Sequence, residues 1–466
     1  MLSLSASISK IFHLYFNRYA SREIFKRLSS EQAFKVIEIE LGFIYDLLYT
    51  KAKAIYSPWG IARRIVGILI TFTVLVVFVT LKERHHHSKI DFIITLVLLV
   101  VALLLELYAF RELLLSDQTA HWLIKHKKPT FLKVIHRTLR PKWPKIVKRR
   151  SWSNSISQFS LLSFSLGKAP LPYYGILKML RIVEMLEIQP YDIPQQDVGD
   201  TKYLIFQGIK DVRDWAEVNN YDTDLKALYG RRGGCTLQRY KREDLAWTVE
   251  KGFDQSILIW HLATEICYFH DYIKPNEIHT WPSEGKQEPQ DERSEKGLVR
   301  RRCNYFSRYM LYLLVRHPNM LPIGMAHIKF RDIYTGIGDF IDEHAGKSVG
   351  DEEEASETLR KVKTDIMLTV GGRDRSRRDR SNYVIFYACK LASALGESEE
   401  KWEIIKNVWL EMLGHAASQC KGRLHAQQLR RGGELLTHVW LLMAHFGLTD
   451  HFQISRSHEI AELILR

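Results

Sequence analysis

Two apolar runs between Ile65 and Phe110 are too long for a soluble fold to bury. The first, Ile65 to Leu81, contains no ionisable residue, and the second, Phe92 to Phe110, contains only Glu106. A hydrocarbon core about 30 Å thick requires roughly 20 helical residues, so each run can span it once its flanks are included. Backbone amides in lipid must be satisfied within the segment, and neither run alternates as a strand does. The sequence therefore predicts a transmembrane helical hairpin within residues 61–116.

The net charge of +14 is concentrated directly after this hairpin. Between Gln118 and Val183 there are 14 Lys or Arg residues and no Asp or Glu, and the rest of the chain is neutral overall. Basic residues near membrane ends stay on the cytoplasmic side. We therefore expect an integral membrane protein with both termini in the cytoplasm, and a basic juxtamembrane region, 117–183, that attracts anionic lipid head groups. Lipid is a simpler partner than nucleic acid for a basic strip attached to a membrane helix.

The segment before the hairpin is predicted to be an amphipathic helix. Ser29 and Gln32 have the spacing of a capping box, and apolar residues at helical spacing continue to about Tyr56. A proline and a glycine then break the pattern. We expect this N-terminal region, residues 1–60, to lie on the bilayer surface or to pack against other membrane helices.

Four residues of the hairpin region have side chains suited to the membrane boundary or to a role within it. Trp59 lies where an interfacial aromatic residue is expected, with Arg63 and Arg64 shortly after it. Glu106 is an intramembrane carboxylate, which makes it a functional candidate by default. It lies about one helical turn from the predicted cytoplasmic end. Because it could pair with either arginine or extend to the head groups, the structural interpretation is favoured.

From about Glu184 onward the sequence is typical of a soluble all-α protein. Helical apolar spacing recurs without a repeat period or strand alternation, at 245–271, 299–315, 384–395, 401–420 and 434–446. Two charged stretches poor in apolar residues are predicted to be disordered inserts. The expected order is a helical cytosolic part, a linker, a second helical part, a disordered linker and a C-terminal helical domain, at 184–281, 282–297, 298–343, 344–382 and 383–466.

Three pairs of histidine and glutamate lie one helical turn apart on one helix face: His261/Glu265, Glu411/His415 and Glu434/His438. Facing helices that carry such pairs could build a carboxylate–histidine metal site. The usual di-iron signature spaces Glu and His by three residues rather than four. The chain contains 19 histidines and 53 acidic residues, so pairs with this spacing arise readily by chance. Surface or half-buried hydrogen-bonded pairs are the favoured interpretation, and no cofactor or catalytic residue is predicted.

Two other motifs also have structural explanations. The loop His85-His86-His87 could bind a transition metal, but adjacent side chains point in different directions, which favours a solvated turn. The double glycines Gly233-Gly234 and Gly432-Gly433 could favour an anion at a helix start, but neither has phosphate-loop spacing. The second pair is better explained as punctuation before the helix that begins near Glu434. The five cysteines form no CxxC pair, and we expect them to be reduced.

Several segments resemble the plant membrane proteins that contain domain of unknown function 4220 followed by domain of unknown function 594. Those similar to the C-terminal domain are residues 401–405, 408–413 and 432–447, with 260–265 and 307–314 upstream of it. Residues 31–38 together with the hairpin resemble the N-terminal membrane domain. The resemblance implies a membrane protein with a helical C-terminal domain. It implies no reaction and no catalytic residues.

Three functions follow as hypotheses. The leading one is a non-enzymatic, membrane-anchored interaction protein whose cytosolic helical domain binds a protein partner. The alternative is a membrane-bound metalloenzyme that uses the three histidine–glutamate pairs. A third hypothesis is a transporter-like subunit with Glu106 lining a polar path.

Overall fold

The computed structural model describes residues 18–80, 89–115, 119, 156–166, 191–218, 230–272, 295–323, 330–345, 351–361, 377–396 and 398–448. The chain divides into two compact units. One, here called the helical unit, comprises Met1–Ile37 and Trp152–Arg466, and the other, here called the hairpin unit, is Glu38–Ser151. The basic strip between residues 125 and 150 and the loop His85-His86-His87 lie outside the described residues, as does most of the predicted linker 282–297.

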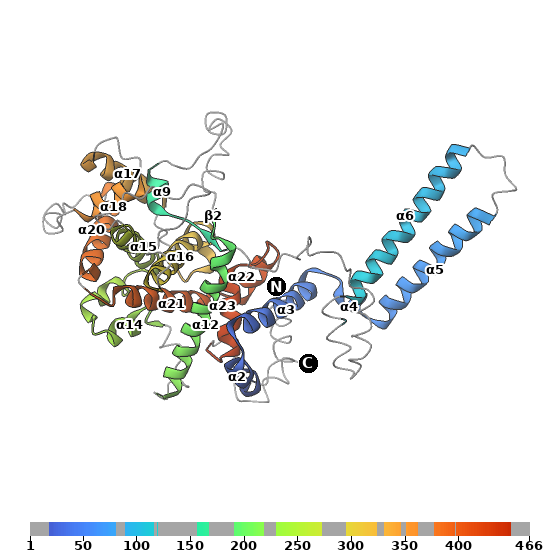
Figure 1. Ribbon diagram of the computed structural model, residues 1–466, viewed down its shortest axis with the longest axis horizontal. Helices are drawn as coiled ribbons and strands as arrows, with labels where there is room; N and C mark the ends of the chain where they lie inside the picture. The colour runs from blue at the N-terminus through green and yellow to red at the C-terminus, as the bar shows by residue number, and fades with distance from the viewer. Residues whose placement is uncertain are drawn as a thin grey trace. The chain divides into compact units, whose positions relative to one another are not determined.

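Two long apolar helices pack side by side in the hairpin unit, α5 (Pro58–Thr80) and α6 (Lys89–Leu114) (Figure 1). Phe78 stacks on Phe92, with ring centroids 5.0 Å apart and ring planes at 10°. Both helices are long and apolar enough to cross a membrane, and neither spanning segment is buried. Proline is well suited to the first turn of α5 because it needs no amide hydrogen there. The predicted helical hairpin has this form.

The helix before the hairpin begins as its cap residues predict. In α3 (Ser30–Tyr49) the amide of Gln32 donates to Ser29 Oγ at 3.3 Å, and Gln32 Oε1 accepts from the Ser29 amide at 3.1 Å. These reciprocal bonds satisfy two amides that helix geometry leaves free. The helix ends at Tyr49 rather than near Tyr56, and a short helix, α4 (Ala52–Ile55), follows.

The helical unit is organised around α15 (Phe253–Tyr272), whose side chains from Ser256 to Phe269 are all buried. Three helices pack directly on it: α16, α18 and α20, at Glu295–Arg316, Glu352–Arg360 and Arg377–Gly396. A helix with apolar residues on every face must be enclosed in this way. The predicted helix 245–271 is divided in the structure: its first residues belong to the 3-10 helix η3 (Glu243–Thr248), and the part that begins at Phe253 is the centre of the core.

A second central helix, α21 (Lys401–Gln419), packs against α16 and organises the C-terminal part of the unit. Its stripe of Ile405, Trp409 and Met412 is fully buried, as the predicted spacing requires. The elements around α15 and α21 complete the unit: α2, α12, α14, η3, η5, α17, α22 and α23, at Arg18–Arg27, Gln195–Val218, Gly234–Arg239, Glu243–Thr248, Pro318–Met320, Phe330–Ala345, Gly422–Leu429 and Leu435–His445. The all-α fold class is confirmed.

The segment after the basic strip folds into the helical unit. A short antiparallel pair joins β1 (Ser157–Gln158) to β2 (Tyr191–Asp192), and a single-turn helix follows β1, α9 (Leu161–Ser165). The side chains of Ile156, Phe159, Leu161 and Leu162 are buried. This end of the predicted basic juxtamembrane region, 117–183, therefore packs into the core of the helical unit.

The prediction of a disordered linker over 344–382 was wrong for its central part. Helix α18 lies within it, and its Ala355 and Leu359 are fully buried. The acidic run that indicated disorder forms the first turn of this helix, where negative charge is favourable, and Asp351 Oδ1 accepts from the amide of Glu352. The C-terminal edge of the same range begins α20.

Candidate functional site: buried histidine–glutamate clusters

The first histidine–glutamate pair is the centre of a fully buried polar cluster. His261 Nε2 lies 3.2 Å from Glu265 Oε2, and both side chains are inaccessible to solvent. The Ser307 hydroxyl of α16 lies 2.8 Å from His261 Nδ1, and the amide of Leu161 lies 3.2 Å from Nε2. A proton on Nε2 binds Glu265, whereas a proton on Nδ1 leaves Nε2 to accept from Leu161. Both ring nitrogens therefore have hydrogen-bond partners.

Glu265 is the charged member of this cluster. Its Oε1 accepts from Arg308 Nε at 3.0 Å, and its Oε2 accepts from the amide of Leu162 at 3.4 Å. Burial alone would raise the pKa of Glu265, but His261 and Arg308 outweigh it and hold the pKa down to about 2. The carboxylate therefore stays ionised inside the core.

Arg308 extends the cluster to a second acid. Its Nη2 lies 3.4 Å from Glu352 Oε2 at the start of α18, and Ser163 of α9 also donates to Glu352. One guanidinium thus joins α15, α16 and α18, while the acids it binds hold the first turn of α9. A planar donor group with five N–H bonds suits such a junction.

Ser307, His261 and Glu265 contact one another in the order of a hydrolytic triad. Here, however, all three side chains are fully buried beneath α9, whose first amides bind His261 and Glu265. A nucleophile must have its oxygen exposed to the substrate. The pair fixes α9 on the core, and it is fully buried rather than on the surface or half-buried as expected.

The second pair does not interact internally. Glu411 faces α14, where its Oε1 accepts from the Thr236 hydroxyl at 2.6 Å, while the His415 ring packs edge-on against Phe253 with ring centroids 4.9 Å apart. Gly233 precedes α14 with φ of 116°, which turns the chain so that the first amides of the helix approach this carboxylate. The anion at the first double glycine is thus the protein's own Glu411.

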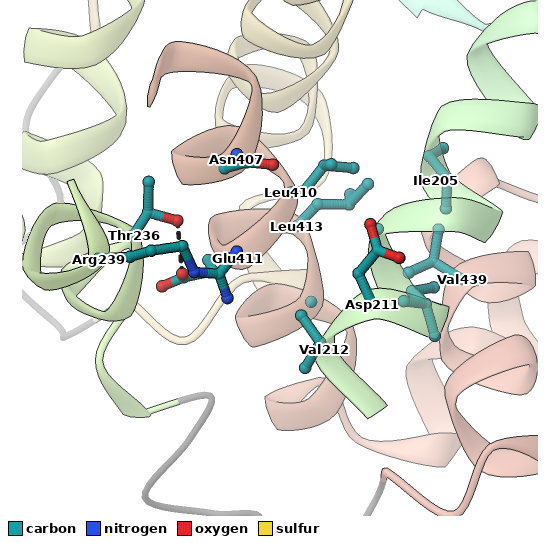
Figure 2. A pocket seen from close by; sticks show the side chains of 13 residues that line it. Ile205, Asp211, Val212, Thr236, Arg239, Asn407, Leu410, Glu411, Leu413 and Val439 are labelled. Carbon is teal, nitrogen blue, oxygen red and sulfur yellow. Dashed lines mark hydrogen bonds between the residues drawn. The ribbon is translucent and has the colours of Figure 1, made fainter. Parts of the chain in front are cut away.

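Glu411 also lines a small cleft of about 40 Å³ between α12, α14, α21 and α23 (Figure 2). Apolar side chains, among them Ile205 and Val439, form much of its wall, and Arg239 and Asp211 contribute opposite charges to its lining. Burial raises the pKa of Glu411, although Thr236 and the amides before and within α14 favour the charged form. Its Oε2 is buried and has no hydrogen-bond partner among the described residues.

Replacing Glu411 by Gln is expected to change how stability depends on pH. A group whose pKa is raised by folding stabilises the native state when protonated, and this stabilisation is lost as pH rises above the usual glutamate value of 4.5. The wild-type midpoint of urea unfolding should therefore fall more between pH 5 and about pH 8 than that of Glu411→Gln. Parallel curves for the two proteins would contradict this.

The third pair is also divided between different partners. Glu434 precedes α23 and accepts from Tyr312 at 3.0 Å, and its Oε1 lies 3.2 Å from His317 Nε2. His438 bonds the backbone oxygen of Glu434 at 3.0 Å rather than its carboxylate. Gly432 and Gly433 have φ of 106° and 81° where α22 ends, so the predicted punctuation is confirmed.

The three pairs do not combine into a metal centre. Among the described residues, which include all six candidates, no group of three or more His, Cys, Asp or Glu side chains is placed to hold a metal ion. Each pair instead has its own partners. The first pair contacts α9 and α16, the second contacts α14, and the third contacts Tyr312 of α16 and His317, which precedes η5. The geometry on which the metalloenzyme alternative depends is not present in this part of the chain.

The cysteines have no disulfide partner, as expected. Burial raises the pKa of each, to about 11 for Cys235 and to about 12 for Cys267, Cys389 and Cys420, and that of Cys303 is also raised. The thiolate is the nucleophile and the metal ligand. These thiols are therefore protonated and unreactive at neutral pH.

In the hairpin unit, Arg64 and Glu106 lie on the partly covered stripes along which α5 and α6 meet. Arg64 precedes Phe78 by as many residues as Glu106 follows Phe92, and these two rings stack. Antiparallel packing of the helices therefore brings Arg64 and Glu106 to the same height along the hairpin. The described residues contain no ion pair between Glu106 and Arg63 or Arg64. Trp59, at the start of α5, is 86% exposed. Its ring is therefore accessible for the contact with lipid head groups expected of an interfacial residue.

Two family models match separate parts of the chain. Residues 2–164 match the model described as Domain of unknown function (DUF4220), and residues 395–448 match the one described as Protein of unknown function, DUF594. The chain carries both domains. The resemblance to these two domains is thereby confirmed, while the similar segments 260–265 and 307–314 lie outside both matches. No curated protein and no solved structure matches the chain. The DUF4220 match includes α5, α6 and most of α9, and the DUF594 match includes α21, α22 and α23.

The two domains contact each other directly within the helical unit. Phe25 of DUF4220 stacks on His445 of DUF594, with ring centroids 3.8 Å apart, and Ser21 Oγ lies 2.7 Å from His445 Nδ1. Lys26 binds Glu217 of α12 at 3.0 Å. Both ends of the DUF4220 match, α2 and α9, are therefore part of the core that also contains DUF594.

Proposed function

We propose that this protein is a membrane-anchored interaction protein. Helices α5 and α6 hold it in a bilayer, and the helical unit that contains DUF594 binds a protein partner beside that bilayer. The observation that carries the proposal is the apolar exterior of the hairpin in a chain whose helical unit has a core of its own.

The exposure of the hairpin supports a role as anchor. All but six of the large hydrophobic side chains exposed among the described residues lie on α5 and α6. A contiguous apolar surface of this extent is costly in water and favourable in lipid. Core helices of soluble proteins can be equally apolar, but their surfaces are buried, whereas these spans are not.

The distribution of charge supports an orientation. The 14 basic residues between Gln118 and Val183 follow α6 directly, and no acid lies among them. We infer that this side of the bilayer is cytoplasmic, that both termini lie there, and that the basic strip binds anionic lipid head groups. Protease protection in sealed vesicles tests this: a tag after Arg466 should be cleaved without detergent.

The size of the cleft beside Glu411 supports a protein ligand rather than a metabolite. Sites for small molecules occupy about 300–1,000 Å³, and this cleft measures about 40 Å³. One side chain of a partner fits such a space. A donor group on that side chain would give a hydrogen bond to Glu411 Oε2. A buried acceptor without such a bond costs folding free energy.

A matched pair of glycine substitutions on α12 tests the partner site. A Cβ at Gly208 would lie 2.7 Å from Leu410 Cδ1 and displace that side chain, which lines the cleft, whereas a Cβ at Gly199 meets nothing within 4 Å. Both changes to alanine favour the helix equally. Proteins cross-linked to the full chain in membranes should include one that wild type and Gly199→Ala capture and Gly208→Ala loses. Equal capture by all three, or no reproducible protein, would contradict the proposed site.

A further inference from the structure

Three aromatic rings surround the ammonium group of Lys251 on the surface of the helical unit. The Lys251 Nζ lies 4.3 Å from the ring centre of Tyr387, 4.9 Å from that of Tyr383 and 5.6 Å from that of Trp247. The Tyr383 hydroxyl also contacts it. Trp247 belongs to η3 and the two tyrosines to α20, so the three rings come from segments distant in sequence. We call these three rings the aromatic cage.

The three rings contact one another at inclined angles and lie around the Lys251 ammonium. Tyr387 and Trp247 have ring centres 4.9 Å apart with planes at 48°, and Tyr387 and Tyr383 have centres 4.3 Å apart with planes at 62°. The faces of aromatic rings carry negative electrostatic potential, and a cation within about 6 Å of several faces is attracted by each. Lys251 thus occupies a site whose geometry is that of an ammonium receptor.

The walls of the cage are held more firmly than its occupant. Arg242 donates to the Ala394 oxygen of α20 at 3.1 Å, and Trp260 donates to the Thr248 hydroxyl at 3.0 Å, so η3 is fixed on both sides. Lys251 reaches the rings on a flexible four-carbon stem and is only half-buried. Its ammonium can therefore withdraw into water without moving the walls.

We propose that the aromatic cage is a binding site for alkylated ammonium ions of the trimethylammonium type, with Lys251 as an internal plug that the ligand displaces. A trimethylammonium group keeps the charge that the rings attract. Its methyl groups contact the ring faces, and it is less strongly hydrated than the primary ammonium of lysine, so it loses less on leaving water. The site stands independently of the hairpin and of the cleft beside Glu411.

Removing the plug provides the test. In the full-length protein in detergent, calorimetry should show that Lys251→Ala binds choline at least about tenfold more tightly than wild type, because a site that is mostly occupied has its apparent affinity reduced in proportion. Lys390→Ala is the matched control: it removes a charge 5.5 Å from the Trp247 ring without emptying the cage, and should change binding little. Adding Tyr383→Ala, at an exposed wall position, should weaken choline binding to Lys251→Ala several-fold.

Two further ligands complete the experiment. Glycerophosphocholine carries the head group of a lipid, and choline is the free ion, so the tighter of the two identifies the source of the group. The uncharged isostere 3,3-dimethyl-1-butanol should not bind, since the rings attract charge. The proposal fails if folded Lys251→Ala binds neither cation, or if it binds the alcohol equally well. It also fails if Lys390→Ala gains as much affinity as Lys251→Ala.

Discussion

Replacing Arg308 by Leu is expected to lower the free energy of unfolding by about 3–5 kcal/mol, the usual cost of leaving a buried charge without its partner. Glu265 would keep its carboxylate inside the core and lose the guanidinium that binds Oε1 at 3.0 Å. Glu352 would lose the same partner. Urea unfolding of the full-length protein in detergent measures the change.

Two further variants separate the buried charge from other effects of the substitution. Arg302→Leu, on the same helix, breaks an ion pair with Asp200, whose side chain is 53% exposed, and should cost less than about 1 kcal/mol. The double variant Arg308→Leu with Glu265→Leu removes both buried charges and should recover part of the lost stability. Equal losses for Arg308→Leu and Arg302→Leu would show that the buried cluster contributes no more than a surface pair.

The same cluster predicts a pH dependence of defined sign. Folding lowers the pKa of Glu265 from 4.5 to about 2, so the folded state binds fewer protons than the unfolded state between those values. The contribution to stability, about 3 kcal/mol, is fully present above pH 4.5 and is lost as pH falls toward 2. The stability difference between wild type and Glu265→Gln should therefore shrink below pH 4.5, and a constant difference across that range would contradict the assignment.

Features that depend on local chemistry were predictable from the sequence. The capping box of Ser29 and Gln32 forms because its two bonds join residues three apart, and the buried stripe of α21 follows from helical spacing alone. The hairpin was predictable for the same reason, since length and composition define it.

Features that depend on distant partners were not. The acidic run of α18 dominates the composition of its segment and therefore predicts disorder, although Ala355 and Leu359 have the i, i+4 spacing of a packed helix face. Its partner Arg308 lies far away in sequence. The Asp351 cap and the acidic first turn were available as signals, but both are also typical of solvated segments.

The histidine–glutamate pairs illustrate the same limit at the site. Spacing placed each pair on one helix face, yet only His261 and Glu265 contact each other through their side chains in the described pairs. Which residues complete each cluster, such as Ser307 or Thr236, is decided by helix packing. Spacing could not show this, because the three pairs are equivalent in sequence and differ only in what faces them.

Introducing a charge on the outer face of the hairpin is expected to have the second large effect. Leu98 lies near the middle of α6 and is 63% exposed, so in a bilayer its side chain would face lipid. Moving an arginine to the centre of a membrane helix costs about 3 kcal/mol, and replacing a leucine adds the loss of its favourable transfer. The fraction of Leu98→Arg protein that resists carbonate extraction from membranes should fall well below that of wild type.

The control for this prediction is an exposed large hydrophobic residue outside the hairpin. Tyr203 of α12 is 48% exposed, and Tyr203→Arg should leave carbonate resistance unchanged because water already surrounds that position. Glu106→Leu removes the acid of the second span and should, if anything, strengthen its insertion. The three variants together show whether lipid or water surrounds the exposed faces of α6 and α12. If Leu98→Arg and Tyr203→Arg behave alike, α6 does not face hydrocarbon, and the exposed apolar side chains of both helices must be covered by protein instead.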